Sequence, residues 1–166
     1  MYECKFFIQP FLFTAMLTQV IVYLDGGANV TGFKELHQCC KFVLSPYDHK
    51  SQKKRGDVKW ELATPSQAQW RDSHMSLKDT HFSWEDHKAS EKLSEIYSII
   101  GNGPRERRDG LHLDSAFKSG AHIFLTSDIG NIWSHRHVLE PLLGFRIFYP
   151  DLEVNLVKEF INRLLA

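Results

Sequence analysis

Three aspartates follow or precede segments that are typical of a parallel α/β sheet. Asp25 comes directly after the apolar run Val20–Leu24, and Asp128 lies just past the apolar run Ile123–Leu125. Asp109 is expected to open a helix. In a parallel sheet, the carboxyl end of a strand lies at the same edge as the N-terminus of the helix before it, so we expect these carboxylates to meet in space. A group of carboxylates of this kind is what a divalent-metal site needs.

The elements that position these acids can be predicted from hydrophobic periodicity. Short apolar runs predict strands over residues 20–24, 58–64, 123–125 and 145–148. Helical spacing predicts helices over residues 31–44, 65–72, 84–100, 109–119, 133–143 and 151–165. This alternation predicts an α/β fold, a three-layer α/β/α sandwich with a mainly parallel central sheet. We expect one domain over residues 18–166, with residues 1–17 as an N-terminal extension, because Met16 is a second candidate start of translation.

Two of the predicted helices carry specific local signals. Thr31 is the expected N-cap of the helix over residues 31–44. In the last helix, Leu152, Leu156 and Phe160 recur at helical spacing.

The composition is that of an ordinary globular domain without a charge bias. Of the 166 residues, 43% are hydrophobic, and twenty basic residues cancel twenty acidic ones. A neutral chain is not marked as a bulk polyanion binder, although local patches can still bind phosphates. The adjacent Cys39 and Cys40, together with Cys4, fit neither a disulfide framework nor zinc spacing, which favours a reducing, cytoplasmic setting.

The mostly apolar segment 6–24 raises the question of a membrane segment. Gln9, Pro10 and Thr14 interrupt it, and no positively charged leader precedes it. We therefore expect a buried strand that ends at Leu24, and no membrane helix.

Two motifs together resemble a known family of nucleases. The run Asp109-Gly-Leu-His-Leu-Asp-Ser-Ala116, followed by Phe124-Leu-Thr-Ser-Asp128, is similar to the C-terminal half of a PIN domain. Val22-Tyr-Leu-Asp25 resembles the family's first strand with its acid, and the segment 143–150 resembles its final strand with the following proline. The resemblance covers most of the chain from about residue 18 onward.

The resemblance implies a function, a cofactor and partners. PIN domains are typically Mg²⁺- or Mn²⁺-dependent nucleases that act on single-stranded RNA, often as toxins of toxin–antitoxin pairs. By this resemblance, Asp25, Asp109 and Asp128 would hold the metal ion. Members of the family often form homodimers and often pair with a small antitoxin protein.

The chain departs from the family pattern at two positions. The family usually has a polar residue two positions after the first acid, whereas here Asn29 would need a shift of the loop to take that place. The family's second acid is normally a Glu, and its slot holds Trp70; Asp72 is the nearest substitute, ahead of Glu61. If Asp72 cannot reach the site, the alternative is a non-catalytic PIN-like module that binds RNA or protein.

Polar residues near the acids are candidates for contacts with substrate. Thr126 and Ser127 lie next to Asp128, and Arg105 and Arg108 belong to a charged turn beside Asp109, where they could contact phosphates.

Other patterns point to structural roles or exclude alternatives. Asp114 lies five residues after Asp109, so helical periodicity places it on another face, toward solvent or behind the site. The pair His135 and His137 lacks zinc spacing. The chain has no Gly-rich loop ending in Gly-Lys-Ser/Thr, which argues against nucleoside triphosphate hydrolysis.

Overall fold

The computed structural model describes residues 19–47, 58–67 and 81–166 of the chain. Five parallel strands form one sheet, in the order β3-β2-β1-β4-β5. In chain order they are β1 (Val20–Leu24), β2 (Cys40–Leu44), β3 (Trp60–Leu62), β4 (Ile123–Leu125) and β5 (Arg146–Phe148). The prediction of a parallel α/β fold is therefore confirmed.

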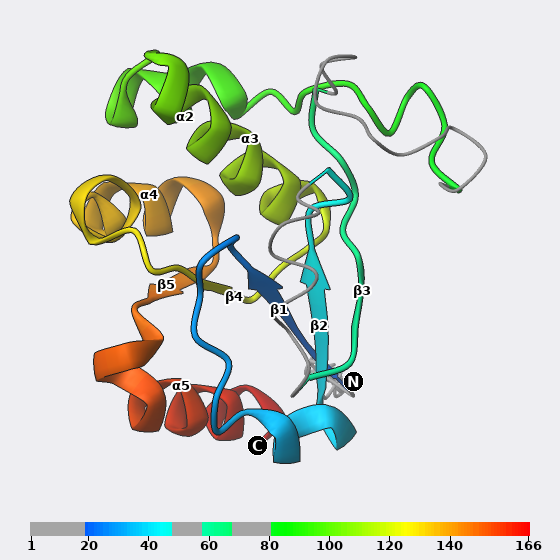
Figure 1. The fold of residues 1–166 in the computed structure, drawn as a ribbon, viewed down its shortest axis with the longest axis vertical. Helices are drawn as coiled ribbons and strands as arrows, with labels where there is room; N and C mark the ends of the chain where they lie inside the picture. The colour runs from blue at the N-terminus through cyan, green and yellow to red at the C-terminus, as the bar shows by residue number, and fades with distance from the viewer. Residues whose placement is uncertain (1–18, 48–57, 68–80) are drawn as a thin grey trace, which may run out of the picture.

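Helical segments cover both faces of this sheet (Figure 1). The 3₁₀ helix η1 (Lys34–Gln38) and the C-terminal helix α5 (Pro150–Leu165) lie on one side. On the other side lie α2 (Leu93–Ile100), α3 (Pro104–Lys118), the π-helical turn η3 (Ile129–Trp133) and α4 (Arg136–Leu143). Among the described residues, no helix combines the length and apolarity that crossing a bilayer requires.

Alternation along the central strands explains the two apolar layers. In β1, Val22 and Leu24 are buried against the layer that contains α5, whereas Tyr23 is buried against the layer of α3 and α4. In β4, Phe124 likewise faces the α3 side and stacks on Tyr23, with ring centroids 5.2 Å apart. Because both faces are covered, both sets of side chains are apolar, as expected for a central parallel strand.

The order of the strands reverses direction between β1 and β4. From β1 the chain continues to β2 on one side of the sheet, and from β4 it continues to β5 on the other. The two strands pair directly, and the Asp25 amide donates to the Leu125 carbonyl at 2.9 Å where they end. In open parallel sheets, ligands bind in the crevice outside the carboxyl ends of the strands at such a reversal. The topology thus directs attention to the loops that follow β1 and β4.

The predicted helix over residues 31–44 is wrong. This segment forms the short helix η1 and then strand β2, and Thr31 is not a helix N-cap. Phe33 and Cys40 do fit a helical spacing, but Cys40, Phe42 and Leu44 also alternate along a strand and are all buried against the layer of α5. Pairing with β1 on one side and β3 on the other outweighs local helical spacing.

The predicted start of the helix at Asp109 is also wrong. Helix α3 begins five residues earlier, at Pro104, so the expected charged turn over residues 105–108 is helical and Asp109 lies inside the helix. Proline is well suited to the first helical position because its missing N–H has no partner there. Asp109 is therefore not an N-cap, and its carboxylate is available for another role.

The remaining boundaries show smaller differences. The helix predicted over residues 84–100 forms only as α2, and the one over 133–143 begins at Arg136. Of the helix predicted over 65–72, the described residues 65–67 are not helical, and the rest lies outside the described part.

The last helix is confirmed as α5, but its apolar residues at helical spacing do not all face the core. Leu152 and Leu156 are 77% and 50% exposed, and the core residues of α5 are Val157 and Ile161 instead. Glu153 departs from helical geometry, with φ −118° and ψ 17°. Its carboxylate accepts hydrogen bonds from the Tyr149 amide, at 2.7 Å, and from the indole nitrogen of Trp133, at 3.1 Å. Polar contacts therefore hold the first turn, and Val157 and Ile161 are the residues of α5 in the buried core cluster.

A backbone amide of the outer strand β5 is hydrogen-bonded to a side chain of α4. Glu140, on α4, accepts a hydrogen bond from the Ile147 amide at 2.8 Å, and its other oxygen lies 3.0 Å from Nε of Arg146. An amide at the edge of the sheet is thus paired within the domain.

Replacing Gly110 with alanine is expected to destabilise the domain. Gly110 faces Tyr97 of α2, and a Cβ there would lie 2.3 Å from the ring atom Cε1. Relieving an overpacked contact costs about 1–3 kcal/mol, which exceeds the gain of about 1 kcal/mol from the better helix propensity of alanine. Thermal denaturation should show a net loss of about 1 kcal/mol, or roughly 2–4 °C. The same substitution in a Tyr97→Leu background should cost less; an equal cost would exclude this contact as the cause.

Candidate functional site

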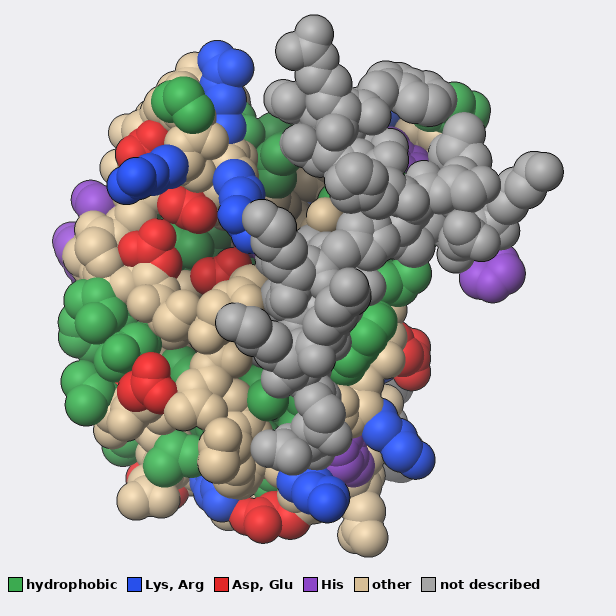
Figure 2. Space-filling model, viewed as in Figure 1, with side chains coloured by type: hydrophobic (Ala, Val, Ile, Leu, Met, Phe, Trp, Pro, Cys, Tyr) green, Lys and Arg blue, Asp and Glu red, His purple; other side chains and the backbone are tan. Residues whose placement is uncertain are grey.

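The three predicted carboxylates line one pocket at the carboxyl ends of β1 and β4. The pocket has a volume of about 320 Å³, and its other lining residues are Gly26, Gly27, Arg105 and Arg108. Asp25 follows β1, Asp128 follows β4, and Asp109 comes from the second turn of α3. Acidic side chains gather below basic ones on the upper left of the face in Figure 2. The sequence-based expectation that these acids meet is therefore confirmed, although Asp109 comes from inside its helix.

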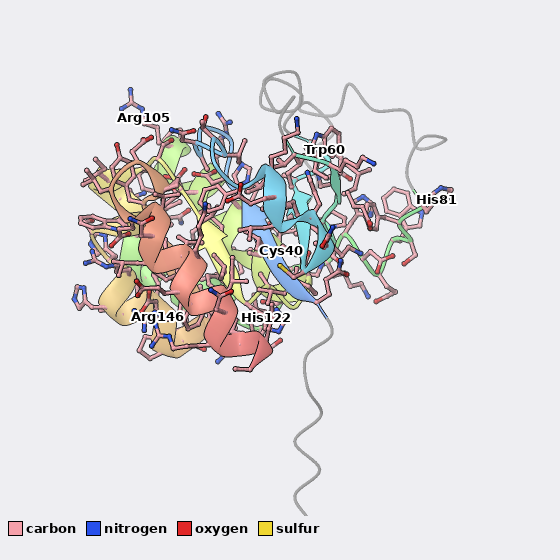
Figure 3. The ribbon with its side chains drawn as sticks, turned by 90° about the horizontal axis from the view of Figure 1, so that it is seen from below. Cys40, Trp60, His81, Arg105, His122 and Arg146 are labelled. Atoms are coloured by element: carbon pink, nitrogen blue, oxygen red, sulfur yellow. The ribbon has the colours of Figure 1, made fainter. Side chains whose placement is uncertain are left out.

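The position of the pocket agrees with the rule for parallel sheets. In Figure 3, Arg105 lies on the side of the molecule opposite His122 and Arg146. His122 precedes β4 and Arg146 begins β5, so both mark the amino ends of strands. The pocket thus lies at the carboxyl edge, where ligands of open α/β sheets bind.

Thr126 connects two of the carboxylates. Its hydroxyl donates to Asp25 Oδ2 at 2.7 Å and accepts from the Asp128 amide at 2.9 Å. Thr126 is fully buried, so its rotamer is fixed by packing. Thr126 therefore orients the Asp25 carboxylate rather than facing a substrate.

Asn131 connects the third carboxylate to the other two. Its backbone amide donates to Asp128 Oδ1 at 2.7 Å, and its side-chain amide donates to Asp109 Oδ2 at 2.8 Å. Together with Thr126, it completes a continuous hydrogen-bond network from Asp25 through Asp128 to Asp109. All of the connecting groups come from residues 126–131, which we call the 126–131 loop.

The environment of Asp109 raises the pKa of its carboxyl group. Burial is the largest cause, and the nearby Asp128 and Asp25 carboxylates raise it further. The hydrogen bond from Asn131 and the proximity of His112 lower it, but they only partly offset the increase. The folded protein therefore holds a negative charge at Asp109 in an unfavourable position, which a bound cation would relieve.

Replacing Asp109 with asparagine is expected to stabilise the metal-free protein at neutral pH. Folding raises the pKa of Asp109 above its unfolded value of about 3.8. The contribution of Asp109 to the free energy of unfolding is therefore fully present below about pH 3.8 and is lost as the pH rises through the folded pKa. The neutral amide avoids this loss, so we expect Asp109→Asn to gain on the order of 1 kcal/mol at pH 7.

Thermal denaturation at pH 7 and at pH 4.5 tests this expectation. The stability difference should shrink at the lower pH as the wild-type carboxyl group takes up a proton. Glu159→Gln, which makes the corresponding change from carboxylate to amide at an exposed position on α5, is the matched control. A variant that is less stable than wild type at both pH values would contradict the expectation.

His112 packs beneath Asp25. Its Nδ1 atom lies 3.8 Å from Asp25 Oδ1 and 3.0 Å from the hydroxyl of the fully buried Tyr23. His112 itself is only 6% exposed. His112 therefore lies behind the Asp25 carboxylate.

The other predicted site residues do not line the pocket or lie outside the described part of the chain. Ser127 is not among the residues that line the pocket, although its Oγ would lie 2.3 Å from a Cβ on the lining residue Gly27. Asn29 does not belong to the pocket, because its side-chain amide donates to Asp151 at the start of α5, at 2.6 Å. The departure from the family pattern at Asn29 therefore remains. Asp72 and Trp70 lie outside the described residues.

Two further acids are accounted for by structural contacts. Of the two alternatives for Asp114, the solvent-facing one is wrong, because the residue is fully buried and accepts hydrogen bonds from Ser66 and Ser90. Glu61, on the outer strand β3, pairs with Lys41 at 2.8 Å and is mostly exposed. Neither acid takes part in the pocket.

The carboxylates share the pocket without forming a tight cluster. Among the described residues, no three Asp, Glu, His or Cys side chains are close enough together to form a metal site. Like charges repel, and the 126–131 loop donates a hydrogen bond to each of the three carboxylates. The arrangement is that of an acidic pocket whose donors would have to approach one another to hold one ion.

Sequence reasoning did not identify Asn131. A signal was present, since an Asp at the start of a turn commonly accepts a hydrogen bond from the amide three residues later. That pattern fixes the backbone of residue 131 close to Asp128. It does not indicate that the side chain would reach Asp109, because this depends on the angle of α3 against the loop.

Comparison with known proteins does not place the chain in a family: no family model, curated protein or solved structure matches it.

Proposed function

We propose that the pocket hydrolyses phosphodiester bonds of single-stranded RNA with the help of Mg²⁺ or Mn²⁺. The observation that carries the proposal is the convergence of Asp25, Asp109 and Asp128 with two arginines in one pocket. This pocket lies at the carboxyl edge of a parallel sheet, where the strand order reverses. The resemblance of the surrounding motifs to PIN domains supplies the reaction and the type of substrate.

The donor set fits a hard divalent cation. All three side chains offer carboxylate oxygens, and Mg²⁺ usually takes only one or two of these from a protein, with water and phosphate completing its coordination. The pKa of Asp109 is raised by burial and by the other two carboxylates, so a cation would offset a real electrostatic cost. When bound, such an ion lowers the pKa of a coordinated water and offsets the charge that develops on the phosphate.

The protein's own groups have separate roles in this proposal. Arg105 and Arg108 are three residues apart on α3 and line the same pocket, so their guanidinium groups can bind phosphate oxygens of the RNA backbone. Gly26 and Gly27 also line the pocket. The space that a side chain at Gly27 would take is occupied by Ser127 Oγ.

A non-catalytic module that binds RNA or protein is the alternative. It is favoured by one observation, the lack of a formed metal site among the described residues. This alternative predicts that the acids only shape the charge of a binding surface.

Cleavage of a mixed-sequence single-stranded RNA by the purified full chain separates the two. We expect cleavage with Mn²⁺, none with excess EDTA, and full activity for the control Glu159→Gln. Mn²⁺ at about 100 times its dissociation constant should also stabilise the fold by about 2.7 kcal/mol. A folded protein that neither cleaves RNA nor gains stability with Mn²⁺ would rule out the proposal and favour the binding module.

A further inference from the structure

The side chain of Asn131 makes a contact that its local turn does not require. Asp128 already begins the π-helical turn η3 by accepting from the Asn131 backbone amide. The Trp133 amide closes the turn by donating to the Asp128 carbonyl at 3.0 Å. Any residue at position 131 with a backbone N–H could make this turn. The bond from the side-chain nitrogen to Asp109 Oδ2, at 2.8 Å, is additional.

This contact joins two elements that are otherwise independent in sequence. Asp109 belongs to α3, which precedes β4 in the chain, and Asp128 belongs to the loop after β4. A carboxylate can only accept hydrogen bonds, so the contact requires the NH₂ group of the amide. A neutral donor satisfies one oxygen of Asp109 without neutralising its charge, which leaves the carboxylate able to bind a cation.

Short π-helical turns are frequent at functional sites, and η3 directly follows the acid of β4. The insertion of one residue per turn changes which side chains face α3. In this turn, Ile132 is fully buried in the apolar layer of α3 and α4. The burial of Ile132 fixes the backbone beside Asn131, and the hydrogen bond to Asp109 holds the side-chain amide.

We propose that Asn131 is a positioning residue whose side-chain amide holds the Asp109 carboxylate beside Asp128 and thereby sets the affinity of the pocket for a divalent cation. This inference rests on the proposed function. Partners that orient metal-binding side chains typically contribute 10–100-fold to metal affinity, about 1.4–2.7 kcal/mol. Asn131 keeps its backbone bond to Asp128 in every side-chain variant, so substitution isolates the contact with Asp109.

Titration of Mn²⁺ by calorimetry into wild type, Asn131→Ala and Asn131→Ser tests the inference. Both variants should bind Mn²⁺ roughly 10–100-fold more weakly. The serine variant keeps a polar side chain suited to the turn but is too short to reach Asp109, and it provides the answer if the alanine variant does not fold. Asn155→Ala, at an exposed position on α5, is the matched control and should bind as wild type does.

RNA cleavage and a double variant distinguish positioning from general support of the fold. The Mn²⁺ concentration for half-maximal cleavage should rise by the same factor, while cleavage at saturating Mn²⁺ recovers. In an Asp109→Asn background, Asn131→Ala should have little further effect on affinity. If wild type binds Mn²⁺ and both Asn131 variants bind it equally well, the inference is wrong and the proposed function stands. If wild type binds no Mn²⁺, both are wrong.

Discussion

Asp128→Asn is expected to reduce Mn²⁺-dependent cleavage of single-stranded RNA by more than about 100-fold, beyond the 10–100-fold typical of groups that only orient metal-binding residues. The substitution replaces a charged oxygen donor with a neutral amide of the same shape. The asparagine oxygen can still accept from the Asn131 amide, as Asp128 Oδ1 does at 2.7 Å. The loss should therefore come from the pocket's charge and donor set rather than from the turn η3.

Circular dichroism and thermal denaturation should show a folded variant with wild-type stability or slightly more, because a carboxylate near the buried Asp109 has been removed. The control is Glu159→Gln, which makes the corresponding change from carboxylate to amide at an exposed position. Cleavage that persists in Asp128→Asn but disappears with EDTA would mean that another set of residues holds the metal. Cleavage that persists both in Asp128→Asn and in the presence of EDTA would indicate a contaminating nuclease.

Asp114→Ala is expected to cause the largest loss of stability. The Asp114 carboxylate is fully buried, and it accepts from the Ser66 hydroxyl and from both the hydroxyl and the amide of Ser90, the latter at 3.2 Å. Alanine leaves three donors without this acceptor and opens a cavity. Each unsatisfied buried donor costs about 1–3 kcal/mol, so we expect a total of about 3–5 kcal/mol after partial relaxation.

For a domain of this size, that loss corresponds to a melting temperature lower by roughly 6–20 °C. Asp114→Asn keeps one accepting oxygen and should cost less, and Ser66→Ala or Ser90→Ala should each cost about 1–2 kcal/mol. Denaturant unfolding of these four variants would measure the order. If Ser90→Ala alone were as damaging as Asp114→Ala, the shared carboxylate would not be the centre of the network.

The sequence predicted four of the five strands and the meeting of the carboxylates where the signals were local, but it assigned β2 to a helix. Ile123–Leu125 is recognisable as a buried strand because it is short, wholly apolar and bounded by turn residues. The positions of Asp25 and Asp128 can then be deduced from the geometry of parallel strands, which places their carboxyl ends at one edge. The prediction succeeded because the direction of a strand fixes the edge of the sheet at which the residues after it lie.

The rest of the site depended on packing that no local pattern records. The start of α3 at Pro104 moved Asp109 from an expected cap into the helix, yet the carboxylate still reaches the pocket. Asp114 was predicted to face solvent or to lie behind the site because helical periodicity gives only its angle from Asp109. Whether that direction leads to water or to Ser66 and Ser90 depends on the segments that pack there, which are distant in sequence.

The bond between Glu140 and the Ile147 amide limits how copies of this chain can associate. An edge strand whose N–H groups are already occupied is a poor template for a strand from another molecule. A homodimer built by continuing the sheet past β5 would first have to break this bond and displace the Arg146 pair. Any self-association of the domain is therefore expected to use side-chain surfaces, such as the exposed Leu152 and Leu156, rather than backbone pairing at β5.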